Sequence, residues 1–257
     1  MRHMNTLIFD VDGTLADTER DGHRPSFNLA FKEFGLDWEW DVPLYGELLA
    51  VTGGKERIRH YVARHHPEQL LDAHFDELVV QLHQSKTRHY MALLEKGAIP
   101  LRPGVRRLLD EARRAGLTLA IATTTTPENV SSLLSTTLGP ESLDWFKVIA
   151  AGDIVPAKKP APDIYLWALE ALGISAPEAL AFEDSENGLR SARAAGLTTL
   201  VTINEYTRGQ DFSGAKAVLS DLGEPDQPYT LHQGQLSAAG WVTVDLCRQL
   251  MQQTQHP

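Results

Sequence analysis

Two aspartates separated by one residue are the side chains of this sequence best suited to chemistry. Asp10 and Asp12 directly follow an apolar run, Leu7 to Phe9, and are followed by Gly13 and Thr14. An apolar run that stops at charged residues is typical of a buried strand that reaches the edge of its sheet. Carboxylates this close repel each other, so keeping both requires a cation or a reaction that uses both. The pair therefore predicts a catalytic or metal-binding site.

Strands and helices alternate after residue 101, and these elements must position the aspartates. After a first strand over 5–9, the patterns predict helices over 103–116, 127–138, 160–172 and 185–196, and strands over 117–122, 148–151, 179–182 and 197–203. Such alternation predicts an α/β fold with a doubly wound, Rossmann-like parallel sheet. Asp10, Thr123, Lys159 and Asp184 all come after predicted strands, so we expect them at one edge of the sheet.

The segment between these parts reads as helical throughout. Helical spacing predicts helices over about 17–34, 43–50, 55–66 and 67–95, with no convincing strand. We therefore expect an α/β core formed by residues 1–17 and 98–257, with a helical cap domain inserted as residues 18–97. After residue 221 the pattern weakens: 241–246 suggests a strand and 246–253 a short helix. We assign no chemical role to residues 223–257.

Composition limits the possible partners and the compartment. The chain has 257 residues, 42% of them hydrophobic, and a formal net charge of −10. This charge argues against nucleic acid or an anionic membrane as a partner. A single cysteine, Cys247, excludes an internal disulfide and fits a reducing compartment. The sequence shows neither a secretory signal nor a run of ~20 apolar residues, so we expect a cytoplasmic protein.

Four short motifs resemble those of the haloacid dehalogenase (HAD) superfamily. The run from Asp10 to Thr14 resembles its motif I, Thr123 its motif II, Lys159 its motif III, and Glu183-Asp184 its motif IV. Their order and spacing agree over roughly residues 5–220. The resemblance implies an α/β core, and the helical insert after motif I resembles the cap of the β-phosphoglucomutase-like branch.

The resemblance implies phosphoryl transfer through a covalent intermediate. Asp10 would be the nucleophile that forms an aspartyl-phosphate, and Asp12 would act as general acid and then general base. Thr123 and the backbone N–H of Thr124 would donate hydrogen bonds to the phosphoryl oxygens. Lys159 would balance the charge of Asp10 and the phosphate.

The same resemblance implies Mg²⁺ as the cofactor. Asp10, the backbone carbonyl of Asp12 and Asp184 would bind the ion, with Glu183 in or near that ligand shell. A calcium loop starting at Asp10 is a poor alternative, because position 12 of that loop would be Asp21 instead of a bidentate Glu. The dehalogenases of the superfamily need no second aspartate, so Asp12 favours phosphate esters.

Within the superfamily the chain most resembles CbbY-type phosphatases, on residues 16–24, 52–58 and 120–125. This resemblance implies hydrolysis of xylulose 1,5-bisphosphate, an inhibitor of Rubisco, and hence metabolite repair beside the Calvin cycle, in a bacterial cytosol or a plastid stroma. His23 departs from the pattern, lying one residue later than its counterpart in the mutase branch. The candidate substrate-binding residues are Glu19, His23, Gly53, Gly54, Lys55, Arg57, Lys86, Thr124 and Thr125.

The motifs leave the final acceptor of the phosphoryl group open. A sugar phosphomutase of the same fold would pass it to a second sugar oxygen instead of water. A sugar-phosphate sensor without turnover is a third possibility, disfavoured because every catalytic residue type is present. The other six histidines of the insert show no metal-ligand set, so packed or solvated roles are expected. We expect a monomer whose partner is a small sugar phosphate or bisphosphate.

Overall fold

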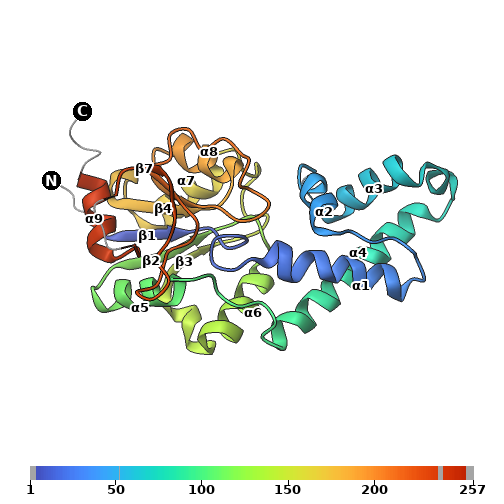
Figure 1. The fold of residues 1–257 in the computed structure, drawn as a ribbon, viewed down its shortest axis with the longest axis horizontal. Helices are drawn as coiled ribbons and strands as arrows, with labels where there is room; N and C mark the ends of the chain where they lie inside the picture. Colours follow the sequence, from blue (N-terminus) through green and yellow to red (C-terminus); the bar gives the residue numbers. More distant parts are fainter. Residues whose placement is uncertain (1–3, 52, 237–239, 253–257) are drawn as a thin grey trace. The chain divides into compact units, whose positions relative to one another are not determined.

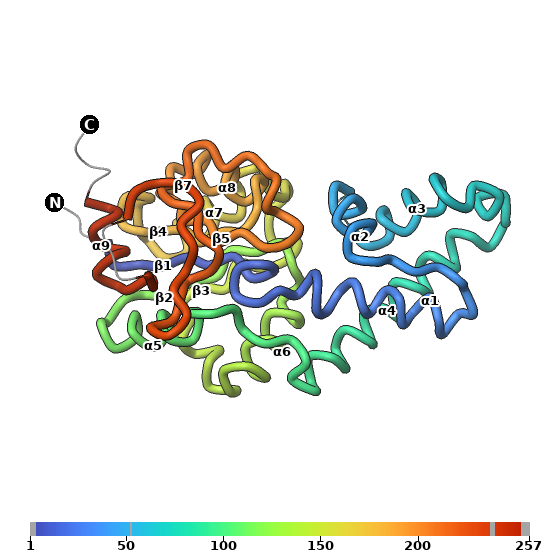
Figure 2. Tube along the Cα trace, in the orientation of Figure 1, coloured from blue at the N-terminus to red at the C-terminus, as the bar shows by residue number. Residues whose placement is uncertain are grey.

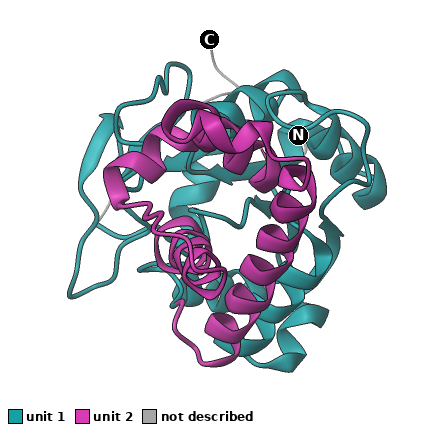
Figure 3. Ribbon diagram, turned by 90° about the vertical axis from the view of Figure 1, so that its right-hand side faces the viewer, with its two compact units in different colours: residues 1–17, 100–257 teal, residues 18–99 magenta. Residues whose placement is uncertain are grey.

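The computed structural model describes residues 4–51, 53–236 and 240–252, and Thr52 in the 52–58 stretch lies outside them. The chain divides into two compact units, of which unit 1 is Met1–Asp17 and Pro100–Pro257 and unit 2 is Thr18–Ile99 (Figure 3). Figure 2 traces the chain from unit 1 into unit 2 and back. Ile99 stays with unit 2, two residues past the expected boundary, because its buried side chain lies against Gly22 and near Tyr90.

Unit 1 contains a seven-stranded sheet whose order is β3-β2-β1-β4-β5-β6-β7. All neighbours pair in parallel except β6 and β7, which are antiparallel. The strands are β1 (Thr6–Phe9), β2 (Thr118–Ala122), β3 (Phe146–Ala150), β4 (Ala179–Glu183), β5 (Thr198–Thr202), β6 (Ala217–Leu219) and β7 (Leu231–Gly234). The predicted doubly wound parallel sheet is confirmed, with an antiparallel edge strand added.

Helices cover the sheet on both sides (Figure 1). Buried side chains of α7 and α8 pack with Ile8 and Ala120 on one face, and α5 lies on the other. The helices of unit 1 are α5 (Val105–Arg114), α6 (Pro127–Leu138), α7 (Asp163–Leu172), α8 (Glu186–Ala194) and α9 (Val244–Gln252). The α7 helix begins three residues later than expected, because Pro162 disfavours helical backbone at Ala161.

The C-terminal part departs most from the sequence-based expectation. Strands β6 and β7 were not predicted, because they are three and four residues long and every residue of β7 is exposed. Residues 241–243 form no strand, although the Val242 N–H donates to Leu222 O at 2.8 Å. The expected helix is present as α9, whose first N–H, on Val244, donates to Glu111 Oε1 at 2.9 Å. Residue 253, the expected end of this helix, lies outside the described residues.

Unit 2 is helical around an aromatic core. It contains a π-helical turn η1 (Glu19–His23), α1 (Arg24–Glu33), α2 (Val42–Leu48), α3 (Gly54–His65), a 3₁₀ turn η2 (Pro67–Leu71) and α4 (Phe75–Glu95). Trp40 is fully buried, with ring centroids 4.6 Å from Phe27 and 4.9 Å from Phe31. The rings of these residues fix the spacing of the surrounding helices.

The long helix predicted over 67–95 is interrupted before residue 75. The Asp72 side chain accepts the His74 N–H at 2.8 Å, which offers the backbone a turn in place of a helix. Leu71 is 87% exposed, so the first turn buries no apolar face that would hold it in a continuous helix. No helix within the described residues is long and apolar enough to cross a membrane.

Candidate active site

Three carboxylates meet where β1 and β4 end. Asp10 follows β1, Glu183 is the last residue of β4, and Asp184 comes next. All three are buried, and each places an oxygen within 4.8 Å of the others. Phe9 pairs with Phe182 in the parallel register, and the Asp10 N–H donates to Phe182 O at 3.0 Å. The parallel register therefore brings residues 10, 183 and 184 to the same sheet edge.

A buried lysine lies among these carboxylates. Lys159 Nζ donates to Asp10 Oδ1 at 2.6 Å, to Glu183 Oε1 at 2.6 Å and to the carbonyl of Ala122 at 2.9 Å. Burial alone would lower the pKa of Lys159, but the negative charges of Asp10 and Glu183 outweigh it and raise that pKa. The ammonium group is therefore charged at neutral pH and holds the Asp10 carboxylate in one orientation.

One lysine does not neutralise three carboxylates. Burial and repulsion from Asp10 outweigh attraction to Lys159 and raise the pKa of Glu183 to about 7. Burial and the charges of Asp10 and Glu183 raise the pKa of Asp184 well above its usual value. Three carboxylates with oxygen atoms this close form a donor set that suits a hard divalent cation. The residues thus fit Mg²⁺, which would lower these pKa values by its own charge.

Two polar side chains hold the motif IV carboxylates. The Tyr165 hydroxyl of α7 donates to Glu183 Oε1 at 2.5 Å. Asn204 Nδ2 donates to Asp184 Oδ2 at 2.7 Å. Sequence analysis singled out neither Tyr165 nor Asn204 as a site residue. Asn204 follows a strand end, as the motif residues do, and that position was the available signal.

Asp12 lies on the loop after β1, where it is partly exposed, and Gly13 next to it has a positive φ of 86°. A Cβ at Gly13 would lie 2.2 Å from Asp184 Oδ2 and 2.7 Å from Asn204 Nδ2. Glycine is therefore required twice, for its backbone conformation and for the close approach of the Asp184 carboxylate. The loop that carries Asp12 packs directly against the carboxylate centre.

The threonines after β2 differ in exposure. Thr123 is buried, its N–H donates to Ala150 O at 2.9 Å, and its Oγ1 accepts the Thr125 N–H at 3.3 Å. Thr124 is exposed and Thr125 is half-buried, with Oγ1 accepting from Asn129 Nδ2 at 3.2 Å. The structure thus places Thr123 at the same sheet edge as Asp10, with Thr124 and Thr125 on the loop beyond.

Unit 2 gathers several of the predicted substrate-binding residues around a second charged centre. Lys86 of α4 is buried, and its Nζ donates to His23 Nδ1 at 2.8 Å. The ammonium group also lies 5.3 Å from the ring centroid of Phe27 and 5.2 Å from that of Tyr90. Burial, then the charges of Lys86 and Arg57, lower the pKa of His23 well below its usual value. His23 is therefore neutral and accepts a hydrogen bond from a buried cation.

Arg57 of α3 is buried and makes hydrogen bonds within its own unit. Its guanidinium donates to Leu48 O at 3.2 Å, Val51 O at 3.3 Å and the Tyr45 hydroxyl at 3.0 Å. Tyr45 in turn donates to Glu19 Oε2 at 2.5 Å. Sequence analysis did not identify Tyr45, and a single tyrosine in a short helix carries no signal for such a relay. Arg57 thus ties the end of α2 to α3 and orients Glu19 through Tyr45.

Gly53 and Gly54 open helix α3 next to these cations. Gly53 has a φ of 96°, and a Cβ at Gly54 would lie 2.7 Å from the His83 ring. Burial, followed by the charges of Lys86 and Lys55, lowers the pKa of His83 to about 4. Lys55, in the first turn of α3, is half-buried. Unit 2 therefore concentrates positive charge beside a glycine-rich helix start, an arrangement suited to an anion.

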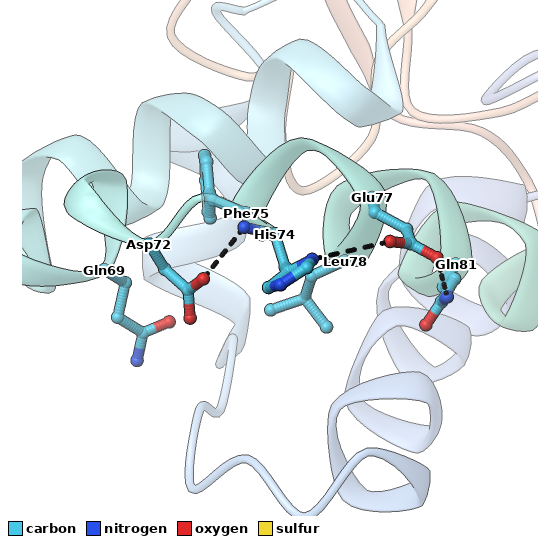
Figure 4. Close-up of a pocket in the computed structure, with 7 residues that line it drawn as sticks. All are labelled: Gln69, Asp72, His74, Phe75, Glu77, Leu78 and Gln81. Atoms are coloured by element: carbon cyan, nitrogen blue, oxygen red, sulfur yellow. Dashed lines mark hydrogen bonds and ion pairs between the residues drawn. The ribbon is translucent and has the colours of Figure 1, made fainter.

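A surface pocket of unit 2 lies elsewhere and contains no predicted site residue (Figure 4). The His74 N–H donates to Asp72, the His74 ring faces Glu77 at 3.8 Å, and Gln81 donates to Glu77 at 3.2 Å. Asp72, His74, Glu77 and Gln81 of this pocket thus bond to one another.

Comparison with known proteins agrees with this geometry. The family model described as haloacid dehalogenase-like hydrolase matches residues 4–196. Protein CbbY of Cupriavidus necator is 51% identical over 229 residues, covering 89% of this chain and 90% of that protein. CbbY from Rhodobacter sphaeroides, solved in complex with phosphate, is 44% identical with a TM-score of 0.73, covering 85% of this chain and 94% of that one. A mutant of that CbbY, solved with xylulose-(1,5)bisphosphate, is 45% identical with a TM-score of 0.74 and the same coverage. The chain belongs to the haloacid dehalogenase-like hydrolase family.

Proposed function

We propose that this HAD-like phosphatase hydrolyses xylulose 1,5-bisphosphate in a Mg²⁺-dependent reaction through an aspartyl-phosphate on Asp10. The observation that carries the proposal is the buried group of Asp10, Glu183 and Asp184 around Lys159 at the ends of parallel strands. The similarity to CbbY proteins, one solved with xylulose-(1,5)bisphosphate, supports the substrate. The proposed role is removal of a sugar bisphosphate that inhibits Rubisco.

Asp10 performs the first half of the reaction. One of its carboxylate oxygens attacks phosphorus, and the bond between phosphorus and the sugar oxygen breaks. Lys159 holds Oδ1 at 2.6 Å, which leaves Oδ2 as the attacking atom. Thr14 Oγ1 lies 3.5 Å from Oδ2, so this oxygen is only weakly engaged. Asp12 donates a proton to the departing sugar oxygen, so that a neutral alcohol leaves.

Water completes the second half. Asp12, now a carboxylate, accepts a proton from the water that attacks phosphorus, and the bond between phosphorus and Asp10 breaks. The products are inorganic phosphate and a regenerated Asp10. Lys159 and Thr123 stabilise the negative charge that spreads over the phosphoryl oxygens. Bound Mg²⁺ would supply further charge neutralisation, held by Asp10, the Asp12 carbonyl and Asp184, with Glu183 nearby.

The cations of unit 2 support a bisphosphate as the substrate. A second phosphate needs positive charge away from Asp10, and Lys55 and Lys86 provide it beside the start of α3. Arg57 supports this region, and its guanidinium is directed at carbonyl groups and Tyr45. Glu19 is proposed to accept hydrogen bonds from sugar hydroxyls in the orientation that Tyr45 imposes.

A phosphate-release panel tests the proposal. The pure protein is incubated with xylulose 1,5-bisphosphate, ribulose 1,5-bisphosphate, fructose 1,6-bisphosphate and hexose monophosphates, each with Mg²⁺ and with EDTA. We expect the highest kcat/KM for xylulose 1,5-bisphosphate and no release in EDTA. Conversion of a hexose phosphate with almost no phosphate release would identify a mutase instead. Tight binding without turnover would indicate a sensor.

The location follows from the same proposal. A sugar bisphosphate that inhibits Rubisco would be removed where Rubisco works, so the proposed location is a bacterial cytosol or a plastid stroma. Cys247 is a free, buried thiol, which is compatible with a reducing compartment.

A further inference from the structure

A second arginine, Arg102, connects the loop of Asp12 to the segment of Asn204. It lies just after the chain returns to unit 1, and its side chain is 7% exposed. Its guanidinium donates to the carbonyls of Gly13 and Thr202, to Ile203 O at 2.6 Å and to Ser220 O at 2.7 Å. These acceptors come from three segments that are far apart in sequence: the loop after β1, the end of β5 with the residue that follows it, and the residue after β6.

Two of these loops carry residues of the candidate site. Gly13 directly follows Asp12, and Ile203 directly precedes Asn204, which holds Asp184. The two loops also contact each other. The Asn204 amide lies so close to Gly13 that a Cβ at residue 13 would be 2.7 Å from Asn204 Nδ2. Arg102 therefore fixes the two loops by their backbone carbonyls, while the Asn204 side chain of the second loop holds Asp184.

Arg102 also holds together the two segments of unit 1 where the chain leaves for unit 2 and returns from it. The Arg102 backbone N–H donates to Leu15 O at 2.8 Å, and Leu101 pairs with Ala16 in an isolated bridge. Its Nε forms an ion pair with Asp17 Oδ1 at 3.3 Å. Asp17 is the last residue of unit 1 before unit 2 begins. Arg102 thus anchors the loop of Asp12 through its guanidinium, and the two crossings through its backbone N–H and its Nε.

We propose that Arg102 is a positioning residue for phosphoryl transfer, because its guanidinium sets the spacing between the Asp12–Gly13 loop and the Ile203–Asn204 segment. The inference rests on the proposed function and deepens it. A planar fork of donors can reach carbonyls on separate loops at once, whereas a lysine presents its donors from a single nitrogen. Charge alone therefore does not replace Arg102.

Arg107 of α5 offers a matched control. It donates to the carbonyls of Leu222, Gly223 and Val242 and to Glu224 Oε2 at 3.1 Å. It is thus another arginine that joins backbone segments of unit 1, but none of these acceptors adjoins a proposed catalytic residue. Arg107→Lys should reveal the effect of losing such a fork on stability alone.

The test compares Arg102→Lys with Arg107→Lys at least 10 °C below the Tm of the less stable variant. For Arg102→Lys we expect kcat to fall by ~30- to 100-fold with KM changed by less than ~3-fold, because small displacements of catalytic groups act on the chemical step. The Mg²⁺ affinity, measured by calorimetry on chelator-treated protein, should fall by ~10-fold. For Arg107→Lys we expect a lowered Tm with kcat and Mg²⁺ affinity within ~2-fold of wild type.

Equal effects of the two substitutions on kcat and Mg²⁺ affinity would overturn the proposal, since both would then act through stability. If Arg102→Lys does not fold, Asp17→Asn removes the negative charge that pairs with Nε, and an unchanged kcat there overturns the proposal as well. If wild-type protein releases no phosphate from any substrate, the proposed function fails. The calorimetric comparison then still decides whether Arg102 positions the carboxylate centre.

Discussion

The two charged centres of this molecule are built in opposite ways. In unit 1, three buried carboxylates surround a single cation, Lys159. In unit 2, a neutral histidine, His23, lies among the cations Lys86 and Arg57. Each centre leaves one sign of charge in excess, so under the proposed function a metal cation would complete the first and an anion the second. In that proposal the residues of unit 1 carry the chemistry and those of unit 2 select the substrate.

The largest effect is expected from removing the proposed nucleophile of unit 1. Asp10→Asn should lower kcat by ~10⁴-fold or more, because an amide cannot form the phosphoenzyme. The amide oxygen can still accept the hydrogen bond from Lys159 Nζ, so the fold should be retained. Phosphate release and thermal unfolding are measured on the same preparation. Appreciable activity in a folded variant would show that Asp10 is not the nucleophile.

The next largest effect is a loss of stability in unit 2, and it tests whether Arg57 has a structural role. Arg57→Met should lower the free energy of unfolding by ~2–4 kcal/mol, because it leaves the carbonyls of Leu48 and Val51 and the Tyr45 hydroxyl without their donor. Arg59 on the same helix is the control, because its side chain is exposed and forms an ion pair with the exposed Asp76. Arg59→Met should change stability by less than ~0.5 kcal/mol. Urea denaturation measures both, and equal losses would contradict the structural role of Arg57.

A smaller effect should distinguish bisphosphates from simple esters. Lys86→Met removes a buried cation of unit 2 and should raise KM for xylulose 1,5-bisphosphate by ~10- to 100-fold. The KM for an aryl phosphate should change by less than ~3-fold, since such a substrate has no second phosphate. Steady-state kinetics with both substrates give the comparison. An equal increase in KM for both substrates would show that Lys86 of unit 2 does not recognise the second phosphate.

The two centres also differ in what the sequence could predict. Asp10, Lys159 and Asp184 were predicted together because strand ends of a parallel sheet share an edge, and the sheet follows from strand–helix alternation. Tyr45 and Arg102 were not predicted, because their roles depend on contacts with residues distant in sequence and their types fit many environments. Strand β7 was missed because it is exposed on both faces and has no apolar pattern. Arg57 was predicted as a substrate-binding residue, and its hydrogen bonds to backbone carbonyls become visible only in three dimensions.

The smallest effect is on the pH dependence of stability, and its sign should differ between the two centres. In unit 2, His23 and His83 have folded-state pKa values below their ordinary value of 6.5, with His83 at about 4. The unfolded state therefore binds more protons between pH 4 and 6.5, and unit 2 should lose stability as the pH falls through this range. His23 faces Lys86, Arg57 and His83, and His83 faces Lys55, Lys86 and Glu56, so protonation of either meets mainly positive charge.

In metal-free unit 1 we expect stability to depend on pH with the opposite sign. The pKa of Glu183 is raised from 4.5 to about 7 and that of Asp184 is also raised, so the folded state binds more protons over that range. This contribution is present below pH 4.5 and is lost as the pH rises towards 7. Hydrogen exchange is measured in EDTA, corrected for intrinsic rates and read peptide by peptide. As the pH is lowered from 7 to 5.5, protection from exchange should fall in unit 2 and rise in unit 1. His83→Gln should reduce the slope in unit 2 only, because a glutamine in its place does not titrate. Slopes of the same sign in both units would mean that the two centres are not of opposite charge, and the division between chemistry and selection would lose its physical basis.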